Sequence, residues 1–304
     1  MPMALDTTPT NAAASAARDP GWQPPLLVKA SVACHLGAGV AAAVVPGEWP
    51  WAAGALALNH VLLTATGLWP RSTWLGPNLR RLPAAAVQRG EIAITLDDGP
   101  DPEVTPAVLD LLDAHGARVT FFCIAERARA HPVLCREIVR RGHAVENHSQ
   151  RHSHRFAFHT LAGFASELGA AQATLGDITG RVPRFFRAPA GLRNPLLGPV
   201  LQKLDLRLVS WTRRGYDTVR RKPARVLGSL TRSLSAGDIL LLHDGNAAHT
   251  ADGRPVLLEV LPGLLQHAAA RGLRTATLAQ GVDGEAAYSA TRTDATASNA
   301  GAGR

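Results

Sequence analysis

Cysteine and aromatic residues are scarce in this chain of 304 residues. The three cysteines, Cys34, Cys123 and Cys135, match no metal-binding spacing, and their odd number offers no disulfide framework, so we expect reduced, buried thiols. Aromatic residues make up only 5% of the chain, too few for an obvious platform on which nucleobases stack. The formal charge of +8 comes mostly from arginines scattered in pairs, which is typical of a solvated or membrane-facing surface and not of a nucleic-acid site.

A glycine-rich phosphate loop is also missing after the first predicted strand, so a dinucleotide-binding fold would have nothing to hold its cofactor. The apolar run at 92–96 predicts a strand buried on both faces of a parallel sheet, and Asp97 and Asp98 follow at its carboxyl end. The Gly-Pro-Asp-Pro sequence at 99–102 ends this strand. Because neighbouring residues on a strand point to opposite sides, we expect the two carboxylates to face apart and to do different work.

From residue 91 onward, short apolar or β-branched runs alternate with longer segments of helical periodicity. This alternation predicts βαβ units and a parallel sheet, either closed as a barrel or open and doubly wound. With 46% hydrophobic residues, one domain of barrel size would use most of the chain. The predicted strands lie at 91–96, 118–124, 143–146, 184–186, 207–210, 238–242 and 274–277, and the predicted helices at 104–115, 132–141, 160–179, 194–204, 223–235 and 255–270.

Polar side chains follow five of these strands at their carboxyl ends. Active sites of α/β barrels are assembled from those ends, on one face of the barrel. We therefore expect an active site built from Asp97, Asp98, Asn147, His148, Arg187, Trp211, His243 and Asp244.

Two histidines in the sequence NHSQRH are spaced as i and i+4. A helical turn after the strand would place the imidazoles of His148 and His152 on one side. Together with one carboxylate they would form a two-His, one-carboxylate set, which leaves coordination positions of a metal free for water and substrate. The spacing alone is weak support, because His154 and His159 lie in the same His-rich stretch.

Five short motifs occur in order along the chain: TLDDGP at 95–100, HSQRH at 148–152, RAPAG at 187–191, SWTRRGYD at 210–217 and LLHDG at 241–245. They resemble the five ordered motifs of the polysaccharide deacetylase family, also called NodB-like, over residues 91–278. The order and spacing of five motifs are far more specific than any one of them. The resemblance implies a distorted (β/α) barrel of seven strands and metal-dependent hydrolysis of an N- or O-acyl group on a sugar.

The resemblance also assigns a role to each motif residue. Asp98, His148 and His152 correspond to the ligands of a divalent metal, most commonly Zn²⁺.

Four further residues take catalytic roles under the same resemblance. Asp97 would be the general base, oriented by Arg187, and His243 the general acid that protonates the leaving amine. Asp217 would steer His243, with Asp244 as the rival for that role. Taken singly, Arg187 also fits a strand-end salt bridge and Asp217 also fits a helix N-cap.

The substrate groove is assigned to Pro189, Ala190, Trp211 and Leu241, with a backbone N–H near Ala190 and the metal holding the oxyanion. Trp211 also fits a simple core aromatic. The motifs depart from the family pattern in several places: Leu96 stands where Phe is usual, no proline follows His152, Ala190 replaces an aromatic, and the fourth motif lacks an Asp-Trp pair. Losing an aromatic wall indicates a substrate other than a long chitin- or peptidoglycan-like chain.

Two apolar stretches, 26–45 and 51–69, precede the motifs and are joined by the turn-forming sequence VPGEWP. Each is about as long as the roughly 20 residues that cross a bilayer, and tryptophans at their ends fit an interfacial belt. Flanking basic residues favour a hairpin with both ends, and the catalytic domain, in the cytoplasm. The alternative is a pair of helices packed on a soluble domain.

We therefore expect a disordered lead-in at 1–25, a membrane-associated helical hairpin at 26–70, a linker at 71–90, the catalytic domain at 91–280 and a disordered tail at 281–304. The expected activity is metal-dependent removal of an N-acyl group from an aminosugar in a polysaccharide, oligosaccharide or lipid-linked glycan. The alternatives are a deformylase of a lipid-linked sugar and a catalytically silent sugar-binding barrel. A glycosidase fits poorly, because it needs two carboxylates across a groove, about 5 to 9.5 Å apart.

Overall fold

The structure, a computed structural model, describes residues 22–45 and 47–284. Most of the predicted lead-in at 1–25 and of the predicted tail at 281–304 lies outside the described residues. The helices are α1 (Leu26–Val44), α2 (Trp49–Gly67), α3 (Ala84–Gln88), α4 (Thr105–Ala114), α5 (Ala125–Ala130), α6 (Pro132–Arg140), η1 (Phe156–Phe158), α7 (Leu161–Thr179), η2 (Pro189–Gly191), α8 (Leu197–Lys203), α9 (Pro223–Thr231), α10 (Val256–Ala270) and α11 (Leu278–Asp283). The strands are β1 (Glu91–Asp97), β2 (Thr120–Cys123), β3 (Ala144–Asn147), β4 (Phe185–Phe186), β5 (Arg207–Leu208), β6 (Arg213–Arg214), β7 (Ile239–His243) and β8 (Arg274–Thr275).

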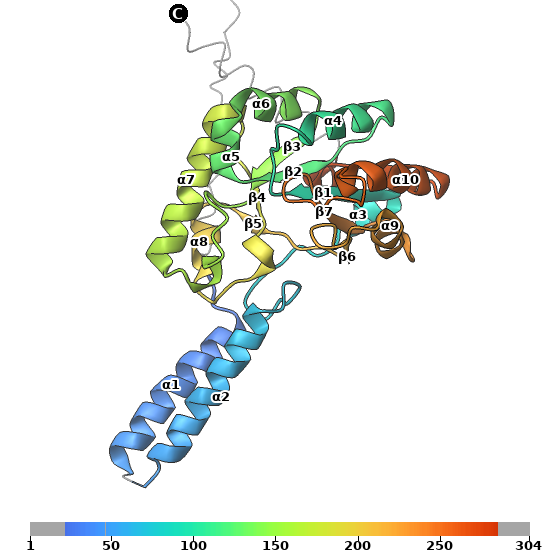
Figure 1. The fold of residues 1–304 in the computed structure, drawn as a ribbon. Helices are drawn as coiled ribbons and strands as arrows, with labels where there is room; N and C mark the ends of the chain where they lie inside the picture. The colour runs from blue at the N-terminus through green and yellow to red at the C-terminus, as the bar shows by residue number, and fades with distance from the viewer. Residues whose placement is uncertain (1–21, 46, 285–304) are drawn as a thin grey trace, which may run out of the picture.

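The strands form one parallel sheet whose path is β5-β4-β3-β2-β1-β7-β6, while β8 pairs with the first half of β1. Every residue of β1 is buried, because β2 and β7 flank this strand and helices cover the sheet (Figure 1). The curled seven-strand path with surrounding helices confirms the predicted barrel-type fold. The carboxyl ends of β1 and β7 are in register, so Asp97 lies directly beside His243 on the neighbouring strand.

The seam of the barrel is filled by the segment that follows α2. Within the described residues no ladder joins β5 to β6. Leu79 instead bridges to Val209 beyond β5, and Arg81 bridges to Asp238 at the start of β7. The segment at 71–90, predicted as a linker, therefore packs into the catalytic domain.

The main hydrophobic core lies between the sheet and the helices on its outer side. Side chains of β1, β2 and β7 pack there against α4, α6, α9 and α10. Cys123 and Cys135 belong to this core as free thiols, as predicted, whereas Cys34 on α1 is only half-buried.

Six short elements were missed by the sequence prediction: α3, α5, η1, η2, β6 and α11. Each has only two to six residues, too few to show a periodicity. Helix α11 begins with a capping box, in which the Thr277 side chain accepts from the Gln280 N–H and the Gln280 side chain accepts in return. The predicted start of the tail at residue 281 is therefore wrong, because residues 281–283 belong to α11.

Helices α1 and α2 project side by side from the catalytic domain as a hairpin (Figure 1). Helix α1 is long and apolar enough to cross a membrane, with a mean hydropathy of 1.6 over a window that is only 6% buried. Helix α2 has the same length but does not reach that hydropathy, because it contains Asn59, His60 and two tryptophans. A hydrogen bond of 2.9 Å from Asn59 to Ser31 joins the two helices. Of the two predicted spans, only the first passes this test within the described residues.

Candidate active site

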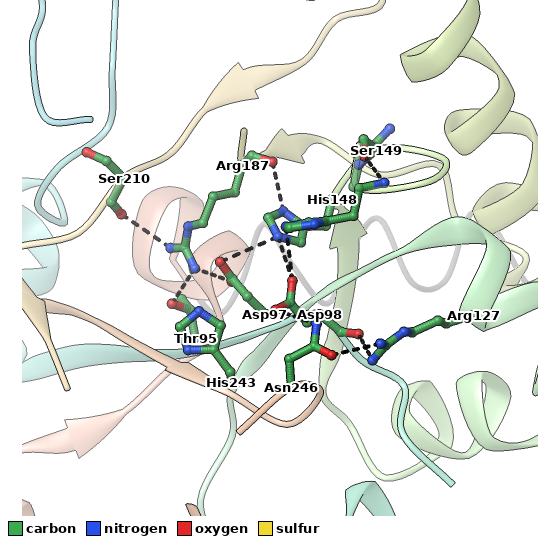
Figure 2. A network of polar contacts seen from close by, with 12 residues as sticks. Thr95, Asp97, Asp98, Arg127, His148, Ser149, Arg187, Ser210, His243 and Asn246 are labelled. Carbon is green, nitrogen blue, oxygen red and sulfur yellow. Dashed lines mark hydrogen bonds and ion pairs between the residues drawn. The ribbon is translucent and has the colours of Figure 1, made fainter. Parts of the chain in front are cut away.

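The carboxylates of Asp97 and Asp98 face the same site, contrary to the expectation that they point apart (Figure 2). Asp97 is the last residue of β1, but Asp98 has left the strand and has a left-handed φ of 72°. This turn brings the second carboxylate round toward the first. His148 Nε2 consequently lies 3.8 Å from Asp97 Oδ2 and 3.2 Å from Asp98 Oδ1.

The loop after β3 holds the two histidines without the predicted helical turn. Ser149 and His152 have left-handed φ values of 69° and 53°, so this segment is a tight loop. Side chains supply its hydrogen bonds: the Ser149 N–H donates to Asn147 Oδ1 at 2.8 Å, and the His152 N–H donates to Ser149 Oγ at 2.9 Å. The prediction of a helix was wrong, but the loop still brings the His148 and His152 rings within 4.9 Å.

A set of three donor atoms with metal-ligand chemistry results. His148 Nε2 and His152 Nε2 each lie 3.2 Å from Asp98 Oδ1, and ligand atoms of the three residues lie within 4.8 Å of one another. Asp98 Oδ1 is buried without a hydrogen-bond partner. His148 Nδ1 lies 2.9 Å from the Arg187 carbonyl oxygen, which fixes the tautomer with the proton on Nδ1 and leaves the Nε2 lone pair free. Two imidazoles and one carboxylate fit a divalent cation such as Zn²⁺.

The charges at this site keep Asp98 ionised. Burial raises the pKa of Asp98, but the neighbouring His148, together with His243 and His152, outweighs it and holds the pKa well below its usual range. Burial and the neighbouring His148 lower the pKa of His152, which favours the neutral imidazole that a metal requires. The pKa of His148 is raised despite burial by Asp97 and Asp98, the same carboxylates that would attract a cation.

Arg187 makes a buried ion pair with Asp97 (Figure 2). Its Nη1 lies 2.5 Å from Asp97 Oδ1 and donates to Thr95 Oγ1 at 2.8 Å. The guanidinium is 1% exposed and stacks on the Phe122 ring at 4.2 Å. Burial lowers the pKa of Arg187, and the charge of Asp97 opposes this effect. A pair this deeply buried orients Asp97 far more strictly than an exposed strand-end salt bridge would.

Asp217 is the partner of His243. Its Oδ1 lies 2.9 Å from His243 Nδ1, and its Oδ2 accepts the His243 main-chain N–H at 2.8 Å. Asp244 instead accepts a hydrogen bond from Thr105 Oγ1 at 2.6 Å, on another side of the strand end. Burial lowers the pKa of His243, but Asp217 outweighs it and raises the pKa above its ordinary value.

The structure also shows a pair that sequence reasoning missed. Asn246 Nδ2 donates to Asp98 Oδ2 at 3.1 Å, and Arg127 Nη2 donates to Asn246 Oδ1 at 3.0 Å. Arg127 Nη1 also donates to the Asp98 carbonyl oxygen at 2.9 Å (Figure 2). In the sequence, only the position of Asn246 just after the LLHDG motif could have indicated this pair, because Arg127 lies on helix α5, which was not predicted.

The residues predicted to wall the groove lie around this network. Pro189 and Ala190 form η2, where Ala190 is exposed with a left-handed φ of 53°. Trp211 follows β5, and the Arg187 guanidinium lies 5.9 Å from the centre of its ring. Leu241 is buried in β7, two residues before His243.

Comparisons with known proteins agree with this geometry. A family model described as polysaccharide deacetylase matches residues 84–209. A chitooligosaccharide deacetylase of Azorhizobium caulinodans is 37% identical over 160 residues, which cover 52% of this chain and 75% of that protein. A peptidoglycan-N-acetylglucosamine deacetylase of Bacillus cereus is 28% identical over 218 residues, covering 68% of this chain and 91% of its own length.

A solved structure shares the fold. The family 4 carbohydrate esterase from Streptomyces lividans, in complex with acetate, superposes with a TM-score of 0.56 at 30% identity, covering 61% of this chain and 91% of that one. The motif order, the barrel and these relatives agree, and the chain belongs to the polysaccharide deacetylase family of hydrolases.

Proposed function

We propose that this protein is a metal-dependent N-deacetylase of an aminosugar, in which Asp97, Asp98, His148, His152, Arg187, Asp217 and His243 form the catalytic centre. The observation that carries the proposal is the unpaired Asp98 Oδ1, buried 3.2 Å from two imidazole Nε2 atoms. A buried carboxylate oxygen without a partner is costly unless a cation completes it. Asp98, His148 and His152 would hold that cation, and two imidazoles with one carboxylate favour Zn²⁺.

A divalent cation held by these residues would lower the pKa of a bound water toward neutrality and would polarise an acyl carbonyl. The chain's own residues then handle the protons. Asp97 forms a buried ion pair with Arg187 and lies 3.8 Å from the His148 imidazole, so it is placed to take the proton of the attacking water. Arg187 holds Asp97 in position and does not itself touch the substrate.

His243 acts at the opposite end of the reaction. An amine leaves a tetrahedral centre only when it is protonated, so a general acid is required. Asp217 holds Nδ1 of His243, which leaves the Nε2–H to be donated to the leaving nitrogen. The raised pKa of His243 favours the protonated imidazole that this role needs.

The substrate is an N-acylated sugar. Named relatives act on chitooligosaccharide and on peptidoglycan N-acetylglucosamine, which supports an N-acetylglucosamine unit. Pro189, Ala190, Trp211 and Leu241 would line the groove, with an N–H near Ala190 assisting the oxyanion. Because Ala190 is small, the groove favours a short or lipid-linked glycan over a long chain, and a formyl group would be removed by the same chemistry. The membrane-length helix α1 supports a lipid-linked substrate. The basic residues that flank the hairpin support a catalytic domain held at the cytoplasmic face.

The test measures metal content and acetate release on the same purified sample, for the intact protein and for His148→Ala. The matched control is His154→Ala, since His154 is an exposed histidine of the same loop. We expect about one metal ion per chain and acetate release in the intact and control proteins, and neither in His148→Ala. Failure of the intact protein to bind metal would refute the site. Metal binding without release from any N-acylated sugar would instead favour the sugar-binding alternative.

The cytoplasmic placement has its own test. A reporter that is active only in the cytoplasm is fused to the C-terminus, and a second reporter active only outside serves as the control. Activity of the external reporter alone would overturn the orientation without affecting the catalytic assignment.

A further inference from the structure

A cavity of about 660 Å³ lies where the hairpin meets the catalytic domain. Both domain-side ends of the hairpin contribute to its wall: Trp22 and Gln23 precede α1, and residues 75–79 follow α2. The rest of the wall comes from the segment that leads into α8, from α8 itself and the turn after it, and from β5. Much of the lining is aliphatic, supplied by Leu75, Leu79, Leu197, Leu201, Leu206 and Leu208.

One buried cation in this wall has no anionic partner. Arg193 is 6% exposed, and its Nε is buried without a hydrogen-bond partner. Its Nη2 donates only to the Ser72 carbonyl oxygen, and no carboxylate of the described residues forms an ion pair with it. Burial accordingly lowers the pKa of Arg193 to about 10. A buried guanidinium in this state is stabilised by any anion that enters the cavity.

The backbone fixes Arg193 to the end of α2. Its N–H donates to the Gly67 carbonyl oxygen at 3.2 Å, and a Cβ on Gly67 would collide with the Arg193 carbonyl oxygen. The position of the guanidinium is therefore tied to the hairpin. Of the other charged residues in the lining, Asp205 and Arg207 offset each other, which leaves the charge of Arg193 uncompensated.

We propose that this cavity binds an anionic membrane lipid, with Arg193 holding the phosphate of the head group and the leucine wall contacting the acyl chain. An aliphatic cavity with one buried unpaired cation matches an amphiphile that carries an anionic head. The cavity lies beside the start of α1, the helix long enough to cross a membrane, so a bilayer lipid has a short path into it. Arg71 and Arg80, exposed near the end of α2, add attraction to an anionic surface. The bound lipid would fix the tilt of the catalytic domain relative to the membrane, a role separate from the deacetylation chemistry.

The first experiment titrates the detergent-solubilised full chain with dioctanoyl phosphatidylglycerol, dioctanoyl phosphatidylcholine and inorganic phosphate, and counts bound molecules by native mass spectrometry. We expect one phosphatidylglycerol to bind in preference to the other two probes. Arg193→Gln should weaken that binding at least tenfold, or about 1.4 kcal/mol. The matched control, Arg225→Gln, removes an exposed positive charge on α9 and should leave the affinity unchanged.

Equal binding of the two lipids, or unchanged binding in Arg193→Gln, would overturn the proposal. Tight binding of inorganic phosphate with no gain from the acyl chains would also overturn it, in favour of a site for free phosphate. If Arg193→Gln does not fold, hydrogen exchange on the unmodified chain tests the lipid site instead. Phosphatidylglycerol should then slow exchange in residues 193–208 and leave α10 unaffected, and no protection at 193–208 would refute the site. These experiments measure neither metal content nor acetate release, so their outcome does not depend on the proposed activity.

Discussion

The Asp217–His243 pair leads to a sharp prediction about pH dependence. Asp217 Oδ1 lies 2.9 Å from His243 Nδ1, and both side chains are buried. Burial alone would lower the pKa of His243, so its raised value depends first on Asp217 and then on Asp97 and Asp98. Asp217→Asn keeps the shape of the side chain and removes its charge. The pKa of His243 should therefore fall.

The size of the decrease in the His243 pKa follows from the hydrogen bond to a charged partner that Asp217→Asn removes. A hydrogen bond to a charged group contributes about 1.5 to 3 kcal/mol, and one pKa unit corresponds to about 1.36 kcal/mol. The pKa of His243 should consequently drop by about one to two units. A general acid works in its protonated form, so activity is lost as pH rises through this pKa. The alkaline limb of the pH profile should therefore move to lower pH by the same amount.

The assay is the pH dependence of kcat/KM for acetate release, which reports the pKa values of the free enzyme. The matched control is Asp244→Asn, because Asp244 is equally buried but accepts its hydrogen bond from Thr105. Its alkaline limb should stay where it is in the intact protein. An unmoved limb in Asp217→Asn, or an equal shift in Asp244→Asn, would refute the assignment of Asp217.

Three further predictions concern the metal-binding end of the site. Asn246→Ala removes the donor to Asp98 Oδ2 and should lower metal affinity about 10- to 100-fold, measured by competition with a chelator; unchanged affinity would show that Asn246 only shapes its loop. Gly245→Ala places a Cβ 2.5 Å from the Asp98 carbonyl oxygen and should cost about 1 to 3 kcal/mol of unfolding free energy. Its control, Gly228→Ala on α9, meets no atom within 4 Å and should not destabilise the protein in the same thermal melt. Asp97→Asn should reduce kcat about 10²- to 10⁴-fold while metal content is retained, and loss of the metal in this variant would make Asp97 a ligand instead of the base.

Much of the catalytic domain could be predicted from sequence because its signals are local. The run at 92–96 is apolar except for Thr95, and a near-continuous apolar run is typical of a strand buried on both faces. The long helix α7 was predicted at 160–179 from its Ala- and Leu-rich sequence, and the structure adds the N-cap at Thr160 and the left-handed stop at Gly180. Helix α5 and strand β6 showed no such signal, because they are too short for a period and are held by neighbouring elements.

The sequence brought Asp98, His148 and His152 together correctly, as the proposed metal ligands, but for a wrong local reason. The i, i+4 spacing of His148 and His152 predicted a helical turn, whereas the structure has a loop held by side-chain hydrogen bonds. The two rings meet because Ser149 and His152 adopt left-handed backbone conformations. Non-glycine residues adopt this conformation only where surrounding contacts impose it, so the spacing could not reveal it.

The sequence by itself determined which chemical groups stand at the ends of which strands, because strand periodicity and turn residues act over a few neighbouring positions. It thereby placed Asp97, Asp98, Arg187 and His243 at the carboxyl-terminal end of a parallel sheet. Only the tertiary structure decided how these groups pair: that Asp98 turns back toward Asp97 and that Asp217 and not Asp244 holds His243. It also decided that the segments flanking the hairpin line a cavity at the domain. These outcomes depend on backbone conformation and on contacts between residues far apart in the chain, where differences of an ångström select one partner over another.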